Sequence, residues 1–150
     1  YSLNTNNAGA GEYRGGYGII LGHEALNDNV YFSGTYGRFD YPAWGYGGGH
    51  DGSPNGFDFI RLDGTHEPMA GTGSKILLKK GDIVRMVTGT GGGYGHPFKR
   101  AEEKVAMDVK NGYITIEDAE ETYGVLVDEK DNTVLGVTEE RKAFQLRQKE

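Results

Sequence analysis

The sequence predicts an α+β fold that is mainly β, and two observations support this prediction. All but three of the 26 glycines lie in residues 1–98, where short apolar runs alternate with turn residues, as is typical of a turn-rich sheet. After Pro97 the apolar residues recur at helical spacing, and more than half of the 22 acidic residues lie in residues 99–150. We therefore expect a glycine-rich twisted antiparallel sheet or open barrel at residues 18–88, followed by helices.

Composition limits the class of protein. A chain of 150 residues suffices for one domain with a buried core, and ten Tyr, six Phe and one Trp argue against disorder. The net charge of −6 gives no attraction to nucleic acid or to an anionic membrane. The absence of cysteine excludes disulfides and thiolate zinc sites. We predict a single cytoplasmic domain at residues 1–150, with a glycine-rich β part (1–98) and a helical part (99–150).

The β part contains five clear strand patterns. Apolar or alternating runs predict strands at residues 18–21, 30–35, 57–62, 74–78 and 83–88. The sequence Asn27-Asp28-Asn29 predicts a turn between the first two strands. The sequence Lys79-Lys80-Gly81-Asp82 predicts a hairpin between the last two.

The helical part has its own start and stop signals. Pro97 suits the first position of a helix, and an apolar stripe follows it at Phe98, Ala101, Val105 and Val109. Thr115 has an acid three residues later, which predicts the capped start of a second helix. We expect a helical pair at about 98–123, a small hairpin around Asp131-Asn132 and a C-terminal helix from Glu139.

The glycine loop before Pro97 is the first candidate site. Gly91, Gly92, Gly93, Tyr94 and Gly95 follow a strand and precede a helix start. The backbone N–H groups of such a loop can bind an anion, assisted by the helix dipole. The alternative is a tight strand-to-helix connection that packs under another subunit.

Four further residues are candidates for ligand or interface contact. Arg14 lies beside Gly15-Gly16, where a guanidinium could bind a carboxylate or phosphate; otherwise it is a surface arginine beside a turn. Trp44 belongs to an aromatic-rich stretch that suits a core lid, a subunit interface or a wall for a substrate ring. His50-Asp51 is one of three histidine–acid pairs. These pairs have the chemistry of metal ligands but lack helical spacing, so we assign no metal site.

The sequence resembles the C-terminal part of the hydantoinase B/oxoprolinase family. The matching motifs occur in family order over most of residues 8–127, and they are AGAGEYRGG (8–16), PAWG (42–45), KKGDIVR (79–85), GGGYG (91–95) and DVKNG (108–112). His96 departs from the family pattern, which usually has an acidic residue before the proline. The chain begins with Tyr1 rather than Met, and we expect a piece of a longer protein or a processed start.

The resemblance implies a function for the larger assembly. Members of the family act with a hydantoinase A-like ATP-binding subunit, and they hydrolyse cyclic amides such as 5-oxoproline or N-methylhydantoin, or carboxylate ketones such as acetone. It implies that this chain helps to form the substrate chamber and the subunit interface, is inactive alone and binds no cofactor. ATP and a divalent metal are then expected elsewhere in the complex. We also expect homo-oligomers. The alternative is a non-catalytic assembly module or a separate small subunit.

Overall fold

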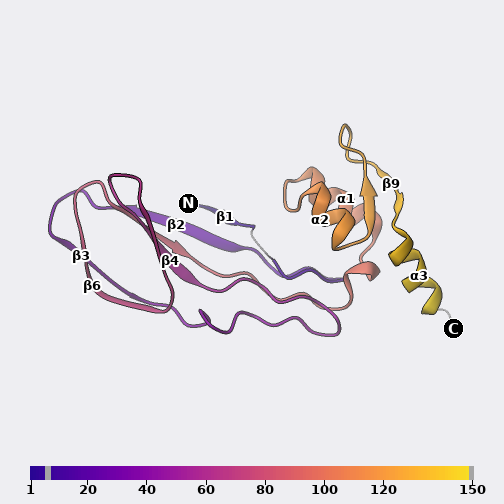
Figure 1. The fold of residues 1–150 in the computed structure, drawn as a ribbon, viewed down its shortest axis with the longest axis horizontal. Coiled ribbons are helices and arrows are strands. Elements are labelled where there is room, and N and C mark those ends of the chain that lie inside the picture. The colour runs from indigo at the N-terminus through magenta and orange to yellow at the C-terminus, as the bar shows by residue number, and fades with distance from the viewer. Residues whose placement is uncertain (6–7, 149–150) are drawn as a thin grey trace.

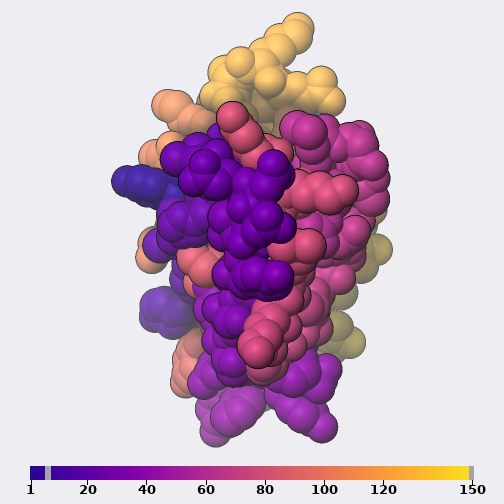
Figure 2. Space-filling view, turned by 90° about the vertical axis from the view of Figure 1, so that its left-hand side faces the viewer, coloured from indigo at the N-terminus to yellow at the C-terminus, as the bar shows by residue number. Residues whose placement is uncertain are grey.

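The computed structural model describes residues 1–5 and 8–148. The strands of the first 88 residues lie at one end, and the helices, together with a small hairpin, lie at the other (Figure 1). Seen from the sheet end, the strands and their loops cover the near face, and the orange and yellow residues of the helical part project above and behind them (Figure 2). Among the described residues, none of the helices combines the length and the apolar character that crossing a membrane requires.

Two open antiparallel sheets form the β part, which confirms the predicted α+β, mainly β fold; no closed barrel is formed by the described strands. The larger sheet has the order β1-β2-β7-β4-β5, with β1 (Ser2–Asn4), β2 (Gly18–Glu24), β7 (Ile83–Val87), β4 (Gly56–Ile60) and β5 (His66–Met69). The smaller sheet pairs β3 (Val30–Thr35) with β6 (Thr72–Leu78).

The two sheets pack face to face through aromatic side chains. Phe57 and Phe59 of β4 are buried, as are Val84 of β7 and Leu78 of β6. The ring of Phe32, on β3, lies 5.1 Å from the ring of Phe57 and 5.5 Å from that of Phe59, both edge to face. Such ring pairs add to the stabilisation that comes from burial alone.

Both predicted strand-to-strand turns exist, but neither joins paired strands. β2 pairs with β1 and β7, and β3 pairs with β6, so the turn at residues 27–29 leads from one sheet to the other. The turn at residues 79–82 does the same between β6 and β7. The predicted hairpin at residues 79–82 was wrong because each of its strands has one face in the core between the sheets, and a turn signal does not say in which sheet the next strand pairs.

Three extended glycine-rich segments connect the sheets to the helices, and we call them the glycine bundle (residues 9–16, 43–53 and 89–95). Each segment bonds to both others: Gly9 N donates to Gly91 O at 2.9 Å, Gly93 N to His50 O at 2.9 Å, and His50 N to Ala10 O at 2.8 Å. A Cβ added at Gly92 would overlap the carbonyl of Trp44. The interior of the bundle is therefore backbone, which only glycine permits at this spacing.

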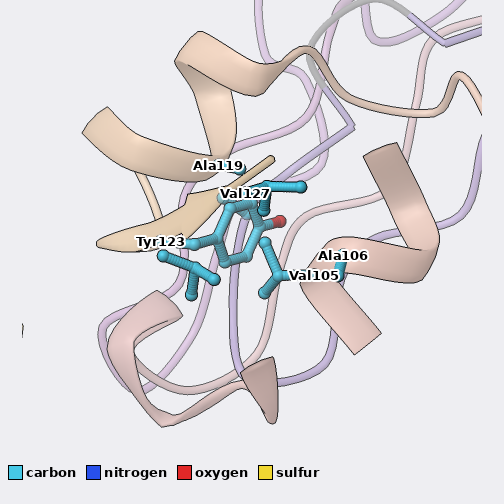
Figure 3. Packing of buried hydrophobic residues seen from close by; sticks show 7 residues of the cluster. Val105, Ala106, Ala119, Tyr123 and Val127 are labelled. Carbon is cyan, nitrogen blue, oxygen red and sulfur yellow. The ribbon is translucent and has the colours of Figure 1, made fainter. Parts of the chain in front are cut away.

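The helical end has a second core (Figure 3). It contains a 3-10 turn η1 (Pro97–Lys99), α1 (Glu102–Lys110), α2 (Ile116–Glu121), a hairpin of β8 (Val125–Val127) and β9 (Val134–Val137), and α3 (Glu139–Arg147). Val105, Ala119, Tyr123 and Val125 are almost fully buried together. Ala10 of the glycine bundle joins the same cluster, so the bundle is part of this core.

The helix predicted to start at Pro97 was wrong in its boundary. Pro97 begins only the 3-10 turn, and Arg100 and Ala101 are extended, with ψ of 132° and 135°. The break is stabilised because the Arg100 carbonyl accepts a hydrogen bond from Arg141 Nη2 at 2.7 Å. The capping box of Thr115 and Asp118, the hairpin and the C-terminal helix are confirmed.

Candidate functional site

A polar cleft of about 310 Å³ lies between the glycine bundle and the helical end. His50 and Asp51 line it from the bundle, and Tyr113, Asp118 and Tyr123 line it from the other side. The structure therefore brings two of the sequence-predicted residues, His50 and Asp51, into one concave site.

The backbone fixes the position of both residues. His50 N donates to Ala10 O, and His50 O accepts from Gly93 N, so this residue is bonded to both neighbouring segments. The Asp51 carboxylate accepts a hydrogen bond from Gly45 N at 2.7 Å through Oδ1. Such bonding holds the two side chains at the rim of the cleft with little freedom in the main chain.

The chemistry of the cleft favours a neutral or cationic polar ligand. Carboxylates, an imidazole and phenols line it, and none of its described lining residues is Lys or Arg. A phosphate would meet Asp51 and Asp118 without a compensating cation. An amide or ammonium group, which can donate hydrogen bonds to these carboxylates, suits the cleft better. Within residues 1–5 and 8–148, no three His, Cys, Asp or Glu side chains gather as a metal site would need.

The loop Gly91–Gly95 lies inside the bundle, and its N–H groups are largely used by the protein. Gly91 N donates to Gly16 O, Tyr94 N to Tyr13 O, and Gly95 N to Tyr46 O, all at 2.8–2.9 Å. Donors that already bond to carbonyls are not free to bind an anion. The anion hypothesis for this loop also relied on a following α-helix, and only the three-residue turn η1 follows it directly.

Arg14 makes its contacts inside the chain. Its Nε donates to Asp108 Oδ2 at 3.3 Å, and its guanidinium lies 4.1 Å above the centre of the Tyr17 ring. Arg100 Nη2 donates to the same Asp108 oxygen at 2.9 Å. The carboxylate that Arg14 binds is thus its own chain's Asp108, on α1, and this contact joins the glycine bundle to the helical end.

Burial also changes the acidity of nearby groups. Burial raises the pKa of Tyr17 to about 12, although the neighbouring Arg14 charge acts in the opposite direction. Burial likewise raises the pKa of Tyr123. Both phenols therefore stay protonated near neutral pH and can act as hydrogen-bond donors.

A row of exposed tyrosines crosses the bundle, and only one of them, Tyr94, was among the candidate site residues. Tyr13, Tyr94 and Tyr46 come from three separate segments, with ring centres 6.1 and 5.9 Å apart. They are 60%, 55% and 68% exposed. The sequence does contain a signal that the three tyrosines share, because each of them lies within a glycine-rich stretch. Trp44, on the same segment as Tyr46, is 77% exposed and does not line the cleft.

Arg141 is a buried residue that the sequence did not point to. It lies within the charged C-terminal helix, yet it is only 3% exposed. Its Nη1 donates to Tyr123 O at 2.8 Å and its Nη2 to Arg100 O. These bonds satisfy carbonyls at the end of α2 and in the break before α1, so Arg141 fastens α3 to the rest of the helical end.

Comparison with known proteins identifies the family. The Hydantoinase B/oxoprolinase family model matches residues 1–97. An uncharacterized protein of Methanocaldococcus jannaschii is 36% identical over 95% of this chain and 25% of its own length. The B-type component of a putative D-/L-hydantoinase from a Pseudomonas species is 35% identical over 85% of this chain and 22% of its own length. The beta component of the caprolactamase of Pseudomonas jessenii is 33% identical, with the same coverage.

Solved structures show the same fold. The crystal structure of the ATP-dependent caprolactamase from Pseudomonas jessenii matches 97% of this chain and 25% of that one, with a TM-score of 0.68 and 30% identity. Nucleotide-free acetone carboxylase matches 99% of this chain and 24% of that one, with a TM-score of 0.59 and 20% identity. The chain spans about a quarter of the length of these relatives. By sequence and by fold, it belongs to the hydantoinase B/oxoprolinase family.

Proposed function

We propose that this chain is the C-terminal domain of the B-type component of an ATP-dependent enzyme that hydrolyses cyclic amides or carboxylates ketones. The observation that carries the proposal is the likeness of nearly the whole chain to an ATP-dependent caprolactamase, at 30% identity and a TM-score of 0.68. A hydantoinase A-like subunit would bind ATP, and a divalent metal would lie elsewhere in the complex. The assembly would work in the cytoplasm, and the isolated chain would be inactive.

The cleft at His50 and Asp51 is where this chain would contribute to the substrate chamber. Hydantoins and lactams carry amide N–H donors and carbonyl acceptors. The Asp51 carboxylate can accept from an N–H, and the His50 imidazole can donate to a carbonyl. The dense backbone bonding of the bundle would keep these groups in place during turnover. The role is ligand contact, and we assign no catalytic step to either side chain.

The test uses the intact B-type component together with its ATP-binding partner. ATP-dependent turnover is measured with caprolactam, a hydantoin and 5-oxoproline, and bicarbonate-dependent turnover with acetone. His50→Ala removes the donor, and Asp51→Asn leaves one amide oxygen, which Gly45 N already occupies. Each should lower kcat/KM by about tenfold, the cost of one lost hydrogen bond to substrate. His66→Ala is the matched control because His66 also precedes an acid but lies on strand β5, and it should leave kcat/KM unchanged.

Two results would overturn the proposal: no ATP-dependent turnover of any of these substrates by the complex, or turnover by residues 1–150 alone. If turnover is normal and both cleft variants match the wild type, the chain is part of the enzyme but this cleft is not part of the substrate chamber.

The second candidate is a non-catalytic assembly module, and the exposed tyrosine row favours it. Exposed aromatic side chains on a rigid backbone are typical of protein interfaces. Under this candidate, Tyr46→Ser and Tyr94→Ser would release the ATP-binding partner in gel filtration. The cleft variants would then leave both binding and turnover unchanged.

A further inference from the structure

The smaller sheet stops above the middle of the larger one. The Phe32 ring contacts Phe57 and Phe59, which places β3 over β4. A Cβ added at Gly73 of β6 would meet the side chain of Met69, which places β6 over β5. The larger sheet continues from β4 to β7, β2 and β1. The outer edge of β3 therefore faces the side of the larger sheet that the smaller sheet leaves uncovered.

That uncovered side carries mostly apolar residues on its inner face, where His23, opposite Val84, is polar and exposed. Residues that pair directly across strands share a face, and the pairs here are Leu21 with Met86 and Leu3 with Ile19. Leu3, Ile19 and Leu21 thus lie on the same face as Met86 and buried Val84. Val84 is 2% exposed, whereas Ile19 is 49% and Leu3 is 56% exposed. The smaller sheet thus covers the core of the larger sheet as far as β7, and it leaves the inner face of β2 and β1 exposed.

β3 also lacks the features that protect the other sheet edges. β5 contains Pro68, β1 has only three residues, and β6 has Lys75 at a φ of 53° in the irregular stretch of its pairing with β3. Proline, shortness, lysine and bulges all discourage strand addition. β3 is Val-Tyr-Phe-Ser-Gly-Thr, with neither charge nor proline. Among the described strands at the edges of the two packed sheets, β3 alone has none of these protections.

We propose that an extended strand from the remainder of the B-type component pairs with the free edge of β3 and covers the inner face of β2 and β1. This inference rests on the proposed function, in which these 150 residues are one domain of a longer component. The strand would carry apolar side chains at alternate positions, because those positions face Leu3 and Ile19. A folded second copy fits poorly, since the larger sheet beside its own β3 would collide with β2 and β1.

The experiment measures two properties of the intact B-type component. Residues 1–150 contain no cysteine, so Ile19→Cys provides a maleimide-labelling probe on the open face. Leu62→Cys is the control, on the turn after β4 and 76% exposed. Hydrogen exchange of the peptide that contains residues 30–35 reports on the edge of β3, and exchange at β5 is its internal control.

We expect the Ile19→Cys variant to react about tenfold or more slowly than the Leu62→Cys variant, and the amides of β3 to exchange more slowly than those of β5. Equal labelling rates would overturn the proposal. Slow labelling with fast exchange at β3 would also overturn it, since the cover would then not be a strand. Neither measurement depends on turnover. An inactive complex would therefore refute the proposed function, while labelling and exchange would still show whether a strand pairs with β3.

Discussion

Asp108 binds two arginines that come from different parts of the chain. Its Oδ2 accepts from Arg14 and from Arg100, and its side chain is 8% exposed. Asp108→Asn would leave two guanidinium groups facing each other with little access to water. We expect the free energy of unfolding to fall by about 3–5 kcal/mol in urea denaturation. Glu139→Gln removes an exposed partner of Lys142 and should cause no measurable change. A loss at Asp108 no larger than that of this control would contradict the prediction.

His96 makes the free energy of unfolding depend on pH. Its Nδ1 accepts from Phe98 N at 3.1 Å, and its ring stacks on Phe144 of α3 at 4.3 Å. Burial lowers the pKa of His96, and the charges of His50 and Lys99 lower it further. As the pH falls below about 6.5, the unfolded chain therefore takes up a proton before the folded chain does, and stability is lost.

His96→Gln should flatten this loss, measured as the free energy of unfolding between pH 7 and about pH 5. The control is Leu62→Ala, which changes an exposed and non-titratable side chain and should keep the pH slope of the wild type. If His96→Gln keeps the wild-type slope, the acid sensitivity arises from another group and the prediction fails.

At the scale of elements, the glycine bundle replaces side-chain packing with backbone packing. Gly92→Ala should destabilise the chain by about 1–3 kcal/mol or more, because the added methyl overlaps the Trp44 carbonyl. Gly16 lies in the same bundle, and a Cβ there would meet no atom within 4 Å. Gly16→Ala is thus the matched control, and its midpoint in thermal unfolding should stay near that of the wild type. Equal midpoints for the two variants would show that the bundle tolerates side chains.

Local signals were sufficient for some elements and not for others. The capping box at Thr115 and the hairpin around Asn132 were predictable because the residues that make them are close in sequence. The pairing of β2 with β7 was not, since partners such as Leu21 and Met86 are far apart in the chain and turn residues do not encode sheet membership. The break at Arg100 depends on Arg141, which is also remote.

For the whole molecule, contacts between remote residues also decide which candidate site residues line the cleft and which do not. His50 and Asp51 were candidates because of their residue types, and the fold brings them to the rim of one cleft. Arg14 and the loop at residues 91–95 had equally suggestive types, but they contact Asp108 and backbone carbonyls of the same chain. The difference is that Arg14 and the loop contact groups of the chain itself, whereas His50 and Asp51 line a cleft, with Asp51 bonded to Gly45 N through Oδ1. Such a difference becomes visible only when distant segments are placed together.

The bundle should also make the two cores unfold together. Its last segment joins β7 directly to η1, and its first segment supplies Ala10 to the helical core and leads into β2. Phe59→Ala in the sheet core should cost about 3–5 kcal/mol. We expect the same shift in midpoint for Trp44 fluorescence, which reports on the bundle, and for the far-UV helical signal. Leu62→Ala, at an exposed turn, should shift neither. A helical signal that keeps the wild-type midpoint in Phe59→Ala would show that the helical end folds independently and that the bundle is only a tether.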